Sequence, residues 1–103
     1  MNEKVFEVLV ALWVGPATAA AVREEVATST GRVPPITSFY RALRSAHDEG
    51  WLDVIEGSEP ESVGRPAQRY ELTPRGREAA AREAARVRRL TSVVLGAQGG
   101  PGR

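Results

Sequence analysis

The sequence predicts a mainly α-helical fold with one small β-hairpin, and three observations carry that prediction. Apolar residues recur at helical spacing, Gly50 is followed by a segment of strand character, and Gly64-Arg65-Pro66 precedes a second such segment. Glycine permits an unusual bend and proline holds its neighbour extended, so we expect Arg65 at the tip of a loop. Helix, strand, arginine-bearing loop and strand follow in the order of a winged helix-turn-helix.

The first part of the chain is expected to form two helices. From Glu3 to Val14, apolar side chains share one side at helical spacing. These are Val5, Phe6, Leu9, Leu12 and Trp13. Gly15-Pro16 ends this helix, and Thr18 is expected to cap a second helix that runs to about Ser29.

A third helix is expected from Thr37 to about Glu49, after a loop that contains Pro34-Pro35. On a helical wheel its two faces differ sharply in character. The apolar face carries Phe39, Ala42, Leu43 and Ala46, and the opposite face carries Thr37, Arg41, Arg44, Ser45 and Asp48. One face should pack on the domain, and the other is available for recognition.

The remainder is expected to form a two-stranded β-wing and a C-terminal helix. The strands are Trp51–Ile55 and Arg69–Leu72, and the thirteen residues 56–68 between them are expected to form a long loop. Thr73-Pro74 should open a fourth helix that ends near Leu95. This gives a DNA-binding unit over residues 1–73, a dimerisation helix over 74–95 and a disordered tail over 96–103.

Composition narrows the classes of function. The chain has 103 residues, a formal net charge of +1, no cysteine and one histidine, His47. Neither disulfides nor thiolate metal sites are available, and without a glycine-rich phosphate loop or a credible carboxylate pair we expect no enzyme and no cofactor. The longest apolar run, Val8–Val14, is far too short to span a membrane. We expect a cytoplasmic protein, with a secretory signal at the N-terminus as the minor alternative.

Two short patterns in this order resemble the PadR family of bacterial transcriptional regulators. They are Phe39-Tyr40-x-x-Leu43 to Gly50-Trp51-Leu52, and Gly64-Arg65-Pro66 to Tyr70-x-Leu72-Thr73-x-x-Gly76. The resemblance covers roughly residues 5 to 94 and is to the smaller subgroup with a single C-terminal helix. It implies a homodimeric repressor whose third helix and wing bind double-stranded DNA at a palindromic operator. It also implies that Ser38 and Tyr40 touch phosphate and that Arg65 belongs to the wing.

The predicted DNA-binding residues are Thr37, Ser38, Tyr40, Arg41, Arg44, Ser45 and Arg65. Arginine to guanine is the commonest specific contact in the major groove, which suits Arg41 and Arg44. The alternative is a solvated helix face in which Arg44 pairs with Asp48. Arg65 would enter a minor groove or meet phosphate, and its alternative is an ion pair with Glu59 or Glu61. For the chain as a whole, the near-neutral net charge leaves an alternative function, a winged-helix module that binds other proteins and does not bind DNA.

The fourth helix carries an apolar stripe, Ala79, Ala80, Val87, Leu90 and Val94, that so small a domain does not obviously cover. The predicted dimer contacts are Phe6, Leu9, Trp13, Val87, Leu90 and Val94. Glu83 interrupts the stripe, so either the contact lies mainly C-terminal to it or an arginine pairs with it across the interface. Trp13 is expected to pack in the core or at the dimer interface, and the alternative, as in some relatives, is that it lines a site for a small aromatic effector at that interface.

Overall fold

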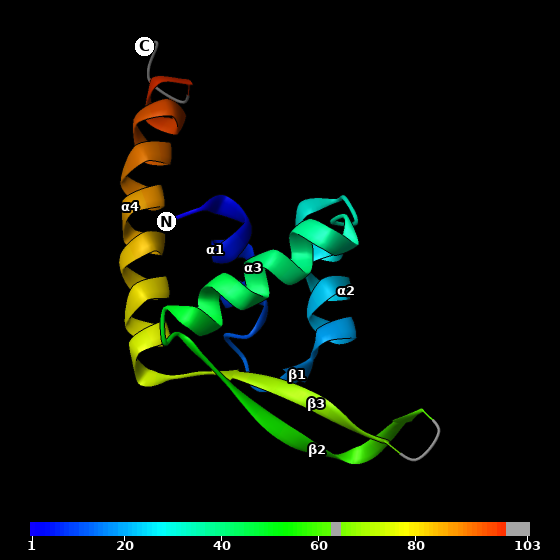
Figure 1. Cartoon of the computed structure of the whole chain (residues 1–103). Coiled ribbons are helices and arrows are strands. Elements are labelled where there is room, and N and C mark those ends of the chain that lie inside the picture. Colours follow the sequence, from blue (N-terminus) through cyan, green and yellow to red (C-terminus); the bar gives the residue numbers. More distant parts are fainter. Residues whose placement is uncertain (63–64, 99–103) are drawn as a thin grey trace.

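The computed structural model describes the backbone of residues 1–62 and 65–98, and the side chains of residues 1–55 and 68–96. Figure 1 shows the shorter helices grouped above a β-sheet, with the longest helix along one side. The elements are α1 (Glu3–Ala11), β1 (Ala17–Thr18), α2 (Ala19–Thr30), α3 (Ile36–Asp48), β2 (Leu52–Ser62), β3 (Arg65–Leu72) and α4 (Pro74–Gln98). Within this described part, no helix is long and apolar enough to cross a membrane.

The hydrophobic core lies between α1, α2 and α3 and is closed below by the sheet. Its largest fully buried side chains are Val8, Leu9, Leu12, Val22 and Leu52. The apolar face predicted for the third helix is buried as expected, with Phe39, Ala42, Leu43 and Ala46 all inside the core. The helical period therefore identified the packed side of α3 correctly.

The ends of the first two helices follow from local hydrogen bonds. The Asn2 side chain accepts from the Lys4 amide at 2.8 Å, which starts α1. This helix ends at Ala11, earlier than the predicted Val14. Thr18 caps α2 as predicted, because its hydroxyl accepts from the Ala21 amide at 3.2 Å. Gly31 ends α2 in the left-handed conformation, with φ of 77°.

The sheet differs from the prediction in two ways. It has three antiparallel strands in the order β1-β3-β2, because the two-residue β1 pairs with β3 at Ala17↔Tyr70 and Thr18↔Arg69. The segment 56–68 is also not a long loop, since β2 continues to Ser62 and β3 begins at Arg65. Proline lacks an amide donor, and the register shifts on both sides of the Pro60↔Pro66 pair accommodate that loss.

Helix α4 begins at Pro74 as predicted and is tied to the end of α3. The Thr73 hydroxyl donates to the Gly50 carbonyl at 2.7 Å and accepts from the Gly76 amide at 2.9 Å. The Thr73 amide donates to the Trp51 carbonyl at 3.0 Å, and the Trp51 amide donates to the Ala46 carbonyl at 3.0 Å. We call these five residues, 46, 50, 51, 73 and 76, the α3–α4 junction.

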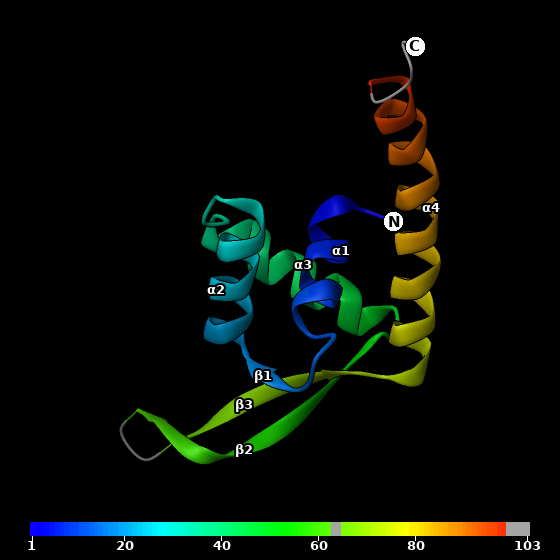
Figure 2. The same ribbon diagram turned by 180° about the vertical axis from the view of Figure 1, so that it is seen from behind.

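The far half of α4 projects past the other helices, as Figures 1 and 2 both show. The molecule is accordingly elongated, with extents of 62 × 27 × 22 Å. The helix ends at Gln98 and not at Leu95, so residues 96–98 are helical and are not part of a disordered tail. Residues 99–103, the rest of the predicted tail, lie outside the described residues.

Candidate nucleic-acid interface

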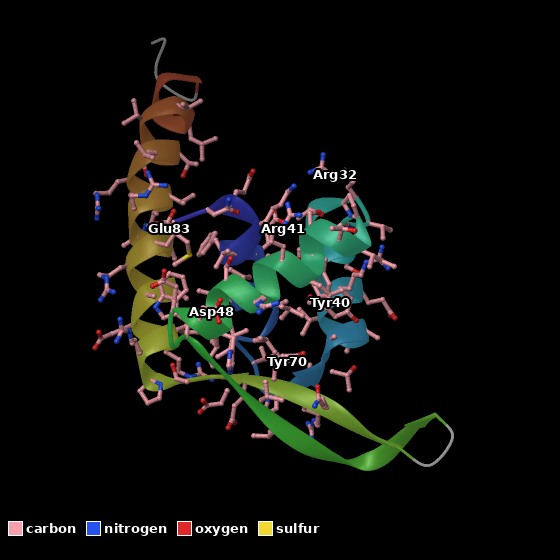
Figure 3. All side chains as sticks on the ribbon, viewed as in Figure 1. Arg32, Tyr40, Arg41, Asp48, Tyr70 and Glu83 are labelled. Atoms are coloured by element: carbon pink, nitrogen blue, oxygen red, sulfur yellow. The ribbon has the colours of Figure 1, made fainter. Side chains whose placement is uncertain are left out.

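The outward face of α3 carries two arginines one helical turn apart. Arg41 and Arg44 are both exposed, as are Thr37, Ser45 and Asp48. Figure 3 shows Arg41 and Tyr40 leaving α3 on different sides, with Tyr40 directed toward the sheet. The exposed face predicted from the sequence is therefore presented to solvent along the length of the helix.

Arg44 does not form the ion pair with Asp48 that the sequence offered as an alternative. The ion pairs among the described side chains involve Glu78 and Glu83 of α4. Within that part of the chain, Arg41 and Arg44 have no acidic partner within 4 Å. A guanidinium carries five N–H donors in a planar fork, so both side chains keep their donors available to an acceptor from outside.

A shallow groove runs between α3 and the sheet. Its lining residues are Thr37, Tyr40, Arg41, Leu43, Arg44, His47, Val54 and Tyr70. Tyr40 is 49% exposed, and its ring packs edge-on against Phe39 with centroids 5.3 Å apart. The ring is therefore held by the core while part of it remains accessible.

The two hydroxyls at the start of α3 differ in their surroundings. Thr37 is exposed, whereas Ser38 is half-buried on the flank that faces α1. The Ser38 hydroxyl donates to the Pro35 carbonyl at 3.2 Å, so its donor is engaged within the chain. Of the two, Thr37 offers the more accessible donor for a phosphate.

The wing is a β-hairpin, and only part of its predicted site is described. The backbone of Arg65 pairs with Ser62 in the hairpin, but its side chain lies outside the described residues. Gly64 lies outside the described residues, and so do the side chains of Glu59 and Glu61, which the alternative ion pair with Arg65 would involve. Arg69, farther along β3, was not among the predicted residues, and its guanidinium donates to the Pro16 carbonyl at 3.3 Å.

The predicted dimer contacts divide into accessible and inaccessible residues. On α4, Leu90 and Val94 are exposed and Val87 is half-buried. Exposed Val93 and Leu95 lie next to them and were not predicted. On α1, Phe6 is half-buried, but Leu9 has no accessible surface. Leu9 was therefore wrongly placed at the interface, because its own chain already buries it completely.

Trp13 lies in the turn that follows α1 and contacts α4. Its side chain is 45% exposed, so Trp13 does not pack in the core of its own chain, which was one of its two expected positions. The Arg77 guanidinium lies 4.9 Å from the ring centroid and also donates to the Trp13 carbonyl at 3.2 Å. This cation–π contact joins the end of α1 to the first turns of α4.

Glu83 pairs with an arginine of its own chain. Its carboxylate accepts from Arg86 Nη2 at 2.8 Å and from Arg86 Nε at 3.2 Å, and the Met1 amino group lies 3.6 Å away. The hydrogen bond from Arg86 is the main reason that the pKa of Glu83 lies below its ordinary value. A buried charge in the apolar stripe is thus compensated without a partner chain.

We expect Glu83→Gln to lower the melting temperature at neutral pH and to have little effect in acid. Because the folded-state pKa is lowered, the charged carboxylate of Glu83 stabilises the fold at pH values above the ordinary pKa of a glutamate. That contribution is lost as the pH falls through the lowered pKa. Thermal denaturation from pH 7 to pH 2 measures the difference. Glu78→Gln is the control, because its pair with Arg82 is exposed and should matter little at any pH. A Glu83→Gln effect independent of pH would contradict this account.

The fold and the exposed helix face define a winged helix-turn-helix protein. No model of a protein family and no curated protein matches the sequence. Solved structures do match it. A PadR family transcription regulator from Clostridium difficile has a TM-score of 0.77 at 14% identity, over 91% of this chain and 96% of that one. A transcriptional regulator from Clostridium thermocellum has a TM-score of 0.75 at 17% identity, over 89% and 86%.

Bacillus subtilis PadR in complex with operator DNA is also similar, with a TM-score of 0.68 at 15% identity. The match covers 81% of this chain and 47% of PadR, so this chain corresponds to about half of that protein. The chain therefore has the fold of PadR-family regulators, which confirms the resemblance found in the sequence.

Proposed function

We propose that this chain is a homodimeric, sequence-specific DNA-binding transcriptional regulator of the cytoplasm that acts as a repressor. The observation that carries the proposal is the pair of exposed arginines on α3, Arg41 and Arg44, which have no acidic partner among the described residues. A helix of this kind enters the major groove, where arginine donates in pairs to guanine. The likeness to PadR, solved in complex with operator DNA, supports the same role.

The decisive experiment is selection of bound duplexes from a random pool by the purified protein. We expect an enriched palindrome whose half-sites are about one helical turn, ~34 Å, apart. Fluorescence anisotropy with the enriched duplex should then show affinity that falls steeply with salt, because phosphate contacts release counterions. No enriched sequence at low salt would contradict the proposal and would favour the protein-interaction module. Repression is tested separately by a promoter reporter carrying the enriched sequence.

The proposed dimer contact is the exposed apolar face of α4, to which Val87, Leu90, Val93 and Val94 contribute. Exposed apolar side chains on a projecting helix are typical of an interface between copies. Half-exposed Trp13, beneath Arg77 at the start of α4, is the candidate residue for stacking with a small aromatic effector.

Changing Leu90 and Val94 together to aspartate is expected to produce a monomer. Burying unpaired charges in an apolar contact costs far more free energy than the contact contributes to dimerisation. Analytical ultracentrifugation measures the mass, and the affinity for the palindrome should fall because one molecule contacts only one half-site. Ser92→Asp, which adds charge on the opposite side of the same helix, is the control and should remain dimeric. A double variant that sediments as a dimer would place the interface elsewhere.

A further inference from the structure

The loop between α2 and α3 positions the recognition helix, and its chemistry is unusual. Pro34 and Pro35 have carbonyl acceptors but no amide donors, so hydrogen bonds to this part of the loop must come from other residues. Pro35 occupies the N-cap of α3, which has no side-chain hydrogen bond to the helix. The start of α3 therefore lacks the capping that Thr18 gives to α2 and Thr73 gives to α4.

Arg23, in the middle of α2, donates hydrogen bonds to this part of the loop. Its Nε and Nη2 both donate to the Pro34 carbonyl, at 2.9 and 2.7 Å. Two donors in a rigid plane on one acceptor restrain the direction of the carbonyl as well as its distance. Arg23 is half-buried, so this contact is partly shielded from water.

The other end of the loop is held separately. Thr30 Oγ1 lies 2.8 Å from the Val26 carbonyl and accepts from the Arg32 amide at 3.3 Å. Arg23 therefore acts on the half of the loop that enters α3, next to the Pro35 carbonyl that accepts from the Phe39 amide at 2.9 Å. Movement of Pro34 would be transmitted to the first turn of α3.

We infer that Arg23 is a positioning residue for DNA recognition, an inference that rests on the proposed function. It fixes the N-terminal end of α3 relative to α2 and so aligns Arg41 and Arg44 with the base edges. Paired hydrogen bonds to a base need both donors at the correct distance and angle, so a small displacement of the helix weakens them. Contacts to phosphate from flexible side chains tolerate the same displacement.

Arg23→Lys tests the inference without changing the charge, because lysine presents a compact ammonium in place of the planar fork. We expect about a tenfold loss in the ratio of specific to non-specific affinity, within the range of a weakened base contact. Non-specific affinity and the salt dependence should stay at wild-type values. The measurement is anisotropy with the selected palindrome and with a scrambled duplex, well below the melting temperature. Amide exchange at Phe39 should also accelerate, while exchange at Ala46 in the core stays unchanged.

Arg32→Ala is the control, because it removes a positive charge from the same loop and its guanidinium makes no hydrogen bond or ion pair to the described residues. It should leave the ratio of specific to non-specific affinity unchanged. An unchanged ratio of specific to non-specific affinity in Arg23→Lys would overturn the inference, whether both affinities stay at wild-type values or both fall equally. If Arg23→Lys folds poorly, Arg23→Gln, which keeps an amide donor, replaces it. A wild-type chain that prefers no sequence would refute the proposed function, and unchanged exchange at Phe39 would then refute the Arg23 contact independently.

Discussion

Replacing Gly76 with alanine is expected to lower the free energy of unfolding by about 3 kcal/mol. A Cβ atom at this position would overlap the Trp51 carbonyl oxygen and would lie 2.9 Å from the carbonyl carbon. Both are backbone atoms, and the same carbonyl accepts from the Thr73 amide. Helix α4 could therefore accommodate the methyl group only by moving away from the Trp51 backbone.

Helix propensity alone predicts the opposite sign, since alanine is favoured over glycine inside a helix by about 1 kcal/mol. Gly96→Ala is thus a matched control in the same helix, because a Cβ there meets nothing within 4 Å. Urea denaturation of all three proteins at one concentration measures the difference. A Gly76→Ala variant as stable as the wild type would show that the close approach to Trp51 is wrong.

Replacing Arg41 and Arg44 together with alanine is expected to abolish sequence preference. Each paired contact to a base contributes about 1–3 kcal/mol of discrimination, so the double variant should lose roughly a hundredfold or more on the selected palindrome. Stability should change little, because both side chains are exposed and have no ion-pair partner among the described residues.

Anisotropy titration against the palindrome and a scrambled duplex measures this loss. Arg88→Ala with Arg89→Ala is the charge-matched control, because both are exposed on α4, away from the outward face of α3. If the two double variants lose affinity equally, the effect is one of net charge and α3 does not read bases. Arg41→Ala and Arg44→Ala tested singly should each relax preference at different positions of the half-site.

The parts of the fold that sequence patterns predicted well are governed by local chemistry. The third helix was located within one residue at each end, because its apolar period and Gly50, with φ of 78°, are both local signals. The caps at Thr18 and before Pro74 were likewise correct. The strand β1 was missed, because two residues give no alternating pattern and pair with β3, which lies some fifty residues away in sequence.

The candidate site was predictable where it depends on one helix face. Arg41 and Arg44 follow from the period of α3. Arg23 does not, because its partner is a backbone carbonyl eleven residues away. Every residue has a backbone carbonyl, so the sequence does not indicate which one accepts a hydrogen bond from this side chain. Leu9 failed for a related reason: a helical wheel identifies an apolar side but cannot tell whether the same chain or another one covers it.

The α3–α4 junction joins the last turn of one helix to the first turn of another through four short hydrogen bonds. The two helices should consequently move together as one rigid unit. A ligand or a neighbouring molecule that swings the projecting end of α4 would re-aim α3 at its base, without needing to touch the surface that faces DNA.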